Sequence, residues 1–217
     1  MTFSIIARDP NSAAFGVAVA TAAPCVGALV PHAKSGVGAV ATQANVNRDL
    51  GVEGLRLLEF GLSPQAALEG LLADDPGRNV RQVAAIDAKG RTFAHSGKDC
   101  VEWFGSRSGQ DYSVQGNMLT GQTVIDAMAE AYESAAGKWI GIRLMAALEA
   151  GQAAGGDKRG RQSAAIVVTP MVVAPGSTLA FDARAYRLDI RVDEHAEPVA
   201  ELRRIFDLML RMGRERG

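Results

Sequence analysis

The chain has 217 residues, of which 47% are hydrophobic and 22% charged, the balance of an ordinary globular protein, and we expect a single domain over residues 1–217. Its 23 basic and 24 acidic side chains leave a formal net charge of −1, which provides no overall field for binding nucleic acid or an anionic membrane. The two cysteines, Cys25 and Cys100, form no CxxC pair, so the sequence predicts neither a disulfide framework nor a metal site, and we expect no cofactor.

The beginning of the chain does not read as a secretion signal, because its apolar run is short and ends at once in charged residues. No segment approaches the ~20 consecutive apolar residues of a transmembrane helix. We therefore expect a cytoplasmic protein with no membrane partner.

Short apolar runs separated by turn residues predict strands in the first 41 residues. Residues 3–7 and 15–20 are apolar and flank the cluster Asp-Pro-Asn-Ser at 9–12, which is typical of a turn and predicts a hairpin. Two further apolar runs, 26–30 and 37–41, predict two more strands.

Helical spacing follows, and then a second hairpin. Leucine and valine recur at helical intervals from Val52 to about residue 62. Ser63 and Pro64 predict the start of another helix, because serine caps a helix N-terminus and proline suits its first position. Residues 83–86 and 91–95 predict a hairpin around Asp-Ala-Lys-Gly.

The second half of the chain continues this mixture of strands and helices. We expect strands at 112–115, 163–168 and 187–192, and helices at 122–133, 138–150 and 198–212. Hairpins separated by pairs of helices lack the strict alternation of a doubly wound parallel sheet. The pattern predicts an α+β fold, a four-layer αββα sandwich of two stacked, mainly antiparallel sheets.

Thr2 is the first candidate for chemistry because of its position. If Met1 is removed, as a small second residue permits, threonine carries a hydroxyl nucleophile and an amine base on one Cα. The α-amino group of a peptide has a pKa of about 7.7–8.0, so part of it is neutral near pH 7. The alternative is that Thr2 only begins a strand, which suits a β-branched residue.

Four segments together resemble one bacterial family. They are the opening TFSIIARDP, residues 30–44, the sequence QGNML at 115–119, and residues 150–164. The chain is similar, nearly from end to end, to a family of unknown function numbered 1028 that is grouped with the N-terminal nucleophile hydrolases. This resemblance implies the αββα fold and amide-bond hydrolysis, with no settled substrate.

A basic loop forms the next candidate site. Lys158, Arg159 and Arg161 lie among glycines between 155 and 162, where side-chain charge and backbone N–H groups suit a carboxylate or phosphate. The loop leads directly into an apolar run, so Ser163 is expected near the core and near a substrate. The alternative is a solvated basic loop without a ligand.

Amide side chains follow the ends of two predicted strands. We interpret Asn117 and Asn45 as candidate catalytic donors to an oxyanion, and Gln43 and Asn47 as candidate substrate contacts. Turn-capping roles are the alternative for each of them. His32, after a proline, is a candidate base or substrate contact, or else a hydrogen-bonded loop residue.

The sequence supports one main hypothesis and two competitors. The main one is hydrolysis of a small amide or peptide-like substrate by Thr2, with the basic loop binding an acidic end of that substrate. The first competitor is a non-catalytic ligand-binding or assembly protein that retains Met1, and the second is an enzyme that uses His32 or Lys158 instead. The apolar stripe and Arg-rich end of the last helix lead us to expect a homo-oligomer.

Overall fold

A computed structural model describes residues 2–169 and 188–215. Within them lie two antiparallel sheets. The six-stranded sheet consists, in spatial order, of β10 (Leu188–Val192), β9 (Ser163–Val168), β2 (Phe15–Thr21), β1 (Thr2–Arg8), β8 (Tyr112–Asn117) and β7 (Gly105–Gly109). The four-stranded sheet consists of β3 (Pro31–Lys34), β4 (Gly38–Ala44), β5 (Arg81–Asp87) and β6 (Thr92–Ser96).

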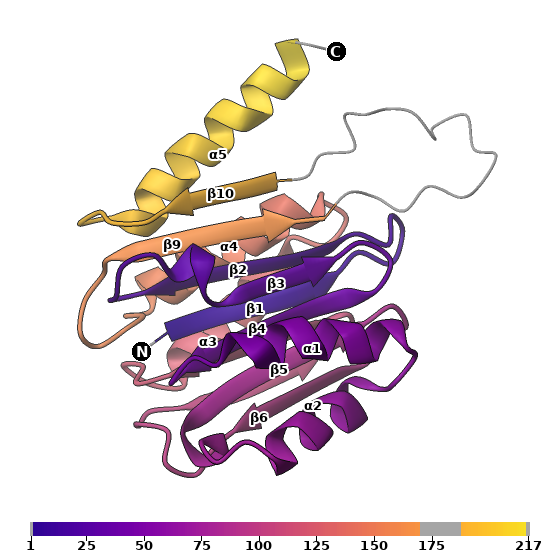
Figure 1. Ribbon diagram of the computed structural model, residues 1–217. Helices are drawn as coiled ribbons and strands as arrows, with labels where there is room; N and C mark the ends of the chain where they lie inside the picture. Colours follow the sequence, from indigo (N-terminus) through magenta and orange to yellow (C-terminus); the bar gives the residue numbers. More distant parts are fainter. Residues whose placement is uncertain (1, 170–187, 216–217) are drawn as a thin grey trace, which may run out of the picture.

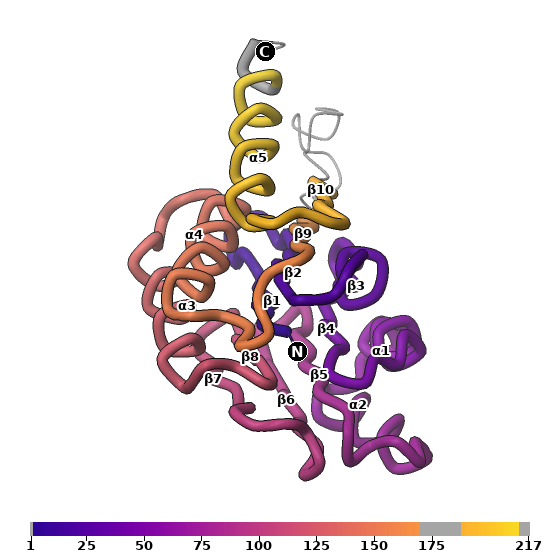
Figure 2. The backbone as a smooth tube through the Cα atoms, turned by 90° about the vertical axis from the view of Figure 1, so that its left-hand side faces the viewer, coloured from indigo at the N-terminus to yellow at the C-terminus, as the bar shows by residue number. Residues whose placement is uncertain are grey.

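Helices cover the outer face of each sheet. The six-stranded sheet lies under α3 (Thr123–Ser134) and α4 (Ile140–Ala153), and the four-stranded sheet lies under α1 (Arg48–Glu59) and α2 (Pro64–Ala73). The last helix, α5 (Pro198–Glu215), packs on β9 and β10. Figure 2 shows the resulting four layers in cross-section. The structure is thus an αββα sandwich, as the sequence predicts.

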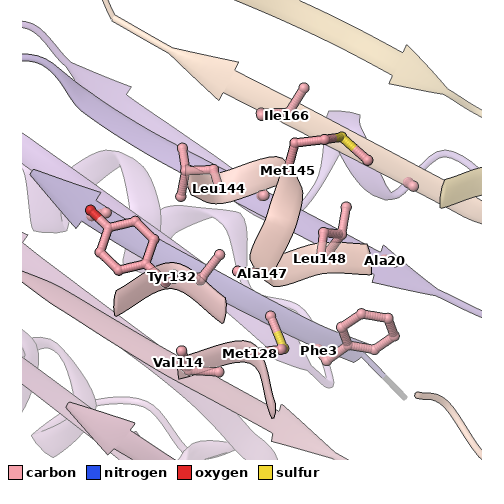
Figure 3. Packing of buried hydrophobic residues seen from close by; sticks show 14 of the residues in the cluster. Phe3, Ala20, Val114, Met128, Tyr132, Leu144, Met145, Ala147, Leu148 and Ile166 are labelled. Atoms are coloured by element: carbon pink, nitrogen blue, oxygen red, sulfur yellow. The ribbon is translucent and has the colours of Figure 1, made fainter. Parts of the chain in front are cut away.

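Three apolar layers hold the sandwich together. The largest lies between the six-stranded sheet and α3 and α4, where Phe3, Met128 and Leu148 pack together (Figure 3). A second lies between the two sheets and includes Ile6 and Phe15, and a third lies under α1 and α2. Because side chains alternate along a strand, Phe3 faces the helices while Thr2 and Ile6 face the second sheet.

Local signals account for most element boundaries. Ser63 caps α2 by accepting a hydrogen bond from Ala66 N at 3.2 Å, and Pro64 occupies the first helical position, as predicted. The strand predicted at 26–30 is wrong, since Val26–Ala28 form a 3₁₀ turn. Val30 N donates to Val26 O at 3.1 Å, and this turn buries both valines between the sheets.

Two short strands have no clear sequence signal. These are the edge strands β3 and β7, of which β7 reads Gly-Ser-Arg-Ser-Gly and has no apolar period. Their pairing with β4 and β8 is decided by tertiary contact. Two residues to which the sequence predictions refer, Met1 and Arg187, lie outside the described residues.

Candidate active site at the head of the central strand

The layer between the sheets changes character along its length. Toward one end it is filled by Ile6, Phe15, Ala39 and Ile86. Toward the end at which β1 begins it is filled by polar side chains, all buried, namely Thr2, Ser4, Gln43, Gln82, Ser113, Gln115 and Asn117. Apolar side chains usually fill a layer between two sheets, so this group of buried polar side chains requires an explanation.

Thr2 lies at the opening of this polar region. It is 6% exposed and is the first residue of β1, a central strand flanked by β2 and β8. Its Oγ1 is 3.2 Å from Thr21 Oγ1 of β2, and across the other ladder it pairs with Asn117 of β8. Its carbonyl oxygen accepts a hydrogen bond from Gln43 Nε2 at 3.4 Å.

Gln82 sets the direction of the hydrogen bonds around Thr2. The carbonyl of Gly116 can only accept, so the group of Gln82 that lies 2.8 Å from it must be the Nε2 donor. Gln82 Oε1 therefore faces the other way, where it accepts from Gln43 Nε2 at 2.7 Å and from Asn117 Nδ2 at 2.9 Å. The Asn117 amide is consequently fixed in one orientation, and its Oδ1 accepts no hydrogen bond from the described residues.

The same order continues into β1 and β8. Gln43 Oε1 accepts from the Ser4 hydroxyl at 2.7 Å, and Ser4 Oγ accepts from Gln115 Nε2 at 2.6 Å. Gln115 Oε1 accepts in turn from Ser113. All of these side chains are uncharged, so the network carries polarity into the core without the cost of a buried ion.

The backbone takes an uncommon conformation where two of these strands end. Ala44 and Met118 have φ values of 67° and 51°, and they directly follow Gln43 and Asn117. Residues other than glycine rarely adopt this region, and strained positions cluster at functional sites. Both strands thus end in this conformation next to a member of the polar region.

The basic loop lies against the same end of the sheets, as Figure 1 shows for the connection from α4 to β9. Asp157 is buried and accepts a hydrogen bond from Ala22 N, one residue after β2, at 2.8 Å. Lys158 N donates to Met118 O, one residue after β8, at 3.3 Å. Because β2 and β8 flank β1, these two contacts place the loop beside Thr2.

The three cations of this loop differ in their partners. Arg159 forms an ion pair with Asp157 at 3.2 Å, and Arg161 forms one with Glu197. Lys158 Nζ donates to the backbone carbonyl of Glu102 at 2.6 Å and lies within 4 Å of no carboxylate among residues 2–169 and 188–215. Its exposed charge is therefore the one best placed to meet an anionic ligand.

Ser163 has a structural position at the start of β9. Its hydroxyl donates to Ala23 O at 2.5 Å and accepts from Val26 N at 3.1 Å. It pairs with Thr21 of β2, so β2 lies between Ser163 and Thr2. These contacts fix the segment after β2 that passes beside the loop.

Asn45 and Asn47 are engaged elsewhere. Asn45 is exposed, and its Oδ1 accepts from Arg81 Nη1 at 3.1 Å. Asn47 caps α1 by accepting from Asp49 N at 3.1 Å, and its Nδ2 lies 3.4 Å from Asp75 Oδ2. The Arg81 guanidinium beside Asp75 holds the pKa of that carboxyl below its usual value. The structure thus places Asn45 and Asn47 in a polar cluster that supports α1.

His32 lies at a different site. It belongs to the edge strand β3, packs against Gly51 of α1, and has its Nδ1 3.2 Å from Val30 O. Burial lowers the pKa of His32 below its usual value. It lines a cleft of about 350 Å³ together with Lys34 and Asp189, and Thr2 is not part of that cleft.

The sequence reasoning missed several members of the polar network. Thr21, Ser4, Gln82 and Gln115 were not predicted as site residues, although each faces the interface from a central strand. Ser4 stands two residues after Thr2 and Gln115 two before Asn117, which is the period that brings side chains to one face. Only the pairing of the sheets shows which of these faces meet.

The described residues contain no group of three or more histidine, cysteine, aspartate or glutamate side chains arranged to hold a metal ion. None of the helices in the same residues has the length and apolar character needed to cross a membrane.

Comparison with known proteins agrees with the fold. The αββα sandwich defines the class of architecture. The sequence profile of a family of unknown function, DUF1028, matches residues 2–202, and the chain belongs to that family.

One solved structure is similar over nearly the whole chain. It is the crystal structure of protein SPO2555 from Silicibacter pomeroyi, which carries the same family assignment. The two share 33% sequence identity with a TM-score of 0.81, over 95% of this chain and 88% of that one. No curated protein matches this sequence.

Proposed function

We propose that this protein is an N-terminal nucleophile hydrolase that cleaves an amide bond in a small or peptide-like substrate. The observation that carries the proposal is the position of Thr2, which begins a central strand at the polar end of the interface between the sheets. Removal of Met1 would give this residue a free α-amino group beside its hydroxyl. A nucleophile and a base would then share one Cα, held by a rigid strand.

The proposed reaction has two steps. Thr2 Oγ1 attacks the substrate carbonyl while its α-amine takes the hydroxyl proton and passes it to the departing amine, which leaves an ester on Thr2. Water then attacks the ester with the same amine as base, which releases the acid and restores the hydroxyl. Asn117 pairs with Thr2 across the ladder, and its unused Oδ1 would accept a hydrogen bond from the α-amine and orient it.

This role of Asn117 differs from the one that the sequence suggests. One of the two N–H groups of its Nδ2 donates to Gln82, which fixes the amide with its Oδ1 available to the α-amine. Asn45 has no part in the proposed reaction, because its amide oxygen is held by Arg81 and the residue is exposed. Asn117 is accordingly a positioning residue for the base.

We assign recognition of an acidic group on the substrate to Lys158. Arg159 and Arg161 are already paired with carboxylates, whereas Lys158 contacts a backbone carbonyl. Its loop passes beside the strands that flank Thr2. A substrate that bears a carboxylate a short distance from its scissile amide would contact both Thr2 and Lys158.

Intact mass measurement of the untagged protein tests the first requirement, with a mass lacking methionine expected. Thr2→Ser should then retain hydrolysis of a panel of N-acyl amino acids, whereas Thr2→Ala should lose it. Lys158→Ala should raise KM for the carboxylate-bearing compounds and leave their uncharged amides unaffected. Lys89→Ala, at an exposed hairpin, is the matched control.

The competing function is that of a ligand-binding protein that retains Met1. The engagement of the Gln43 and Asn117 amide donors with Gln82 favours it, because such donors stabilise a fold without serving a reaction. A mass that retains methionine, or activity that survives Thr2→Ala, would contradict the hydrolase proposal. Activity that survives Thr2→Ala and is lost on changing His32 or Lys158 would instead indicate an enzyme using those groups.

A further inference from the structure

The six-stranded sheet ends at β10, whose outer edge pairs with no other strand of the described residues. An open edge presents unpaired backbone donors and acceptors, which is a template for another strand. The side chains of β10 alternate strictly: Leu188, Ile190 and Val192 are buried, whereas Asp189 and Arg191 are exposed. The apolar set faces the side of the sheet on which α5 lies.

Helix α5 extends past this edge. Figure 2 shows the helix continuing beyond β10 and away from the rest of the molecule. At its base it is fixed to α4, because Arg203 Nε donates to Glu149 Oε1 at 2.7 Å and Phe206 stacks on Trp139 with ring centroids 5.9 Å apart. The direction of the projecting half is therefore set by contacts within the chain.

Val199, Leu202 and Phe206 form the buried stripe of α5. Farther along the helix, Leu208, Met209 and Met212 are 41%, 44% and 36% exposed. At about 100° per residue, Met209 lies beside the buried stripe, whereas Leu208 lies on the opposite side of the helix from Phe206. Contiguous exposed apolar residues on a projecting helix are typical of an interaction surface.

The charges of β10 indicate what pairs with this edge. In an antiparallel pair of two β10 strands related by a two-fold axis at Ile190, Asp189 of each strand lies opposite Arg191 of the other, and Leu188 lies opposite Val192. Opposite charges directly across an antiparallel pair are favourable, and like charges are unfavourable. A two-fold axis at Asp189 or at Arg191 would place like charges together, so the sequence selects Ile190.

We propose that two copies of this chain associate through β10, with a two-fold axis at Ile190, into one continuous sheet. The projecting half of each α5 then lies over the sheet edge of the other copy, on the face opposite Asp189 and Arg191. Met209, beside the buried stripe, is buried there. This inference rests on the edge strand and the helix, and it is independent of the proposed reaction at Thr2.

A charge exchange tests the arrangement by sedimentation equilibrium. The unaltered chain is expected to be a dimer. Asp189→Arg places arginine opposite arginine and Arg191→Asp places aspartate opposite aspartate, so each single variant should have a dimer Kd roughly 10- to 30-fold higher than that of the parent. The double variant restores opposite charges and should be a dimer, and an equimolar mixture of the two single variants should form a mixed dimer.

Two substitutions of apolar residues separate this surface from a general effect of added charge. Met209→Glu should weaken the dimer by roughly 100-fold in Kd. Phe60→Glu, at the end of α1 and 82% exposed, should leave it unchanged. Thermal unfolding of every variant shows whether the fold is intact.

The results that would overturn the proposal are specific. A chain that is monomeric at about 100 μM has no stable contact of this kind. A dimer whose Kd is unchanged by both single charge substitutions uses a different interface.

Discussion

Replacement of Gln82 by leucine tests whether the polar network supports the fold. Gln82 Oε1 accepts from Gln43 and Asn117, and its Nε2 donates to Gly116 O and to Ser96 Oγ at 2.9 Å. Leucine has a similar volume but no polar atom. The amides of Gln43 and Asn117 and the carbonyl of Gly116 would lose a partner while they stay buried, whereas Ser96 is partly exposed and can reach water.

Asn117 Nδ2 would keep no other partner among the described residues, whereas Gln43 Nε2 would keep Thr2 O and Gln115 O, each at 3.4 Å. A buried group without a partner costs roughly 1–3 kcal/mol, and each hydrogen bond lost at Gln43 and Gly116 costs about 1 kcal/mol. Burying leucine in place of an amide offsets about 1–2 kcal/mol. We expect Gln82→Leu to lower the free energy of unfolding by about 3 kcal/mol. That is a large share of a typical total of roughly 5–15 kcal/mol.

Urea unfolding followed by fluorescence and circular dichroism measures this difference, with an unchanged slope expected. Gln65→Leu, at an exposed position of α2, is the matched control and should change the free energy by less than about 0.5 kcal/mol. A Gln82→Leu variant within about 0.5 kcal/mol of the parent would refute the reasoning, because the network would then contribute no stability.

Two further predictions concern His32 and Gly51. Burial lowers the folded-state pKa of His32 below its usual 6.5, so the unfolded state binds protons first and stability falls as pH decreases below about 6.5. In urea unfolding, a His32→Gln variant should lose less stability than the parent between about pH 7.5 and pH 5.5. An equal loss would contradict this prediction. A Cβ on Gly51 would lie 2.3 Å from His32 Nδ1, so Gly51→Ala should destabilise the protein by about 1–3 kcal/mol. In a His32→Ala background the same change should become stabilising through helix propensity, by up to about 1 kcal/mol, and a cost that persists there would show that the clash is not with His32.

The candidate site was predictable in part. Thr2, Asn117, Gln43 and the basic loop are brought together, because strand order places β2 and β8 beside β1 and the loop crosses their ends. Asn47 has a signal of its own, an asparagine before a helix, and it caps α1. His32 lies in a separate cleft, and no spacing in the sequence distinguishes that position from one beside Thr2.

The sequence by itself determined the elements that depend on local patterns. These include the N-terminal hairpin, the capped start of α2, the helices, and the alternation that gives β10 one apolar and one charged face. Such features arise from side-chain period and from backbone preference within a few residues.

Tertiary structure alone decided how those elements meet. The glycine-rich strand β7 exists because β8 pairs with it, and Gln82 became the centre of the network because β5 lies opposite β8 across the interface. A buried amide looks the same in sequence whether it ends a turn or holds a site, because its partners come from segments dozens of residues away. Long-range pairing of the strands therefore decided which polar side chains surround Thr2.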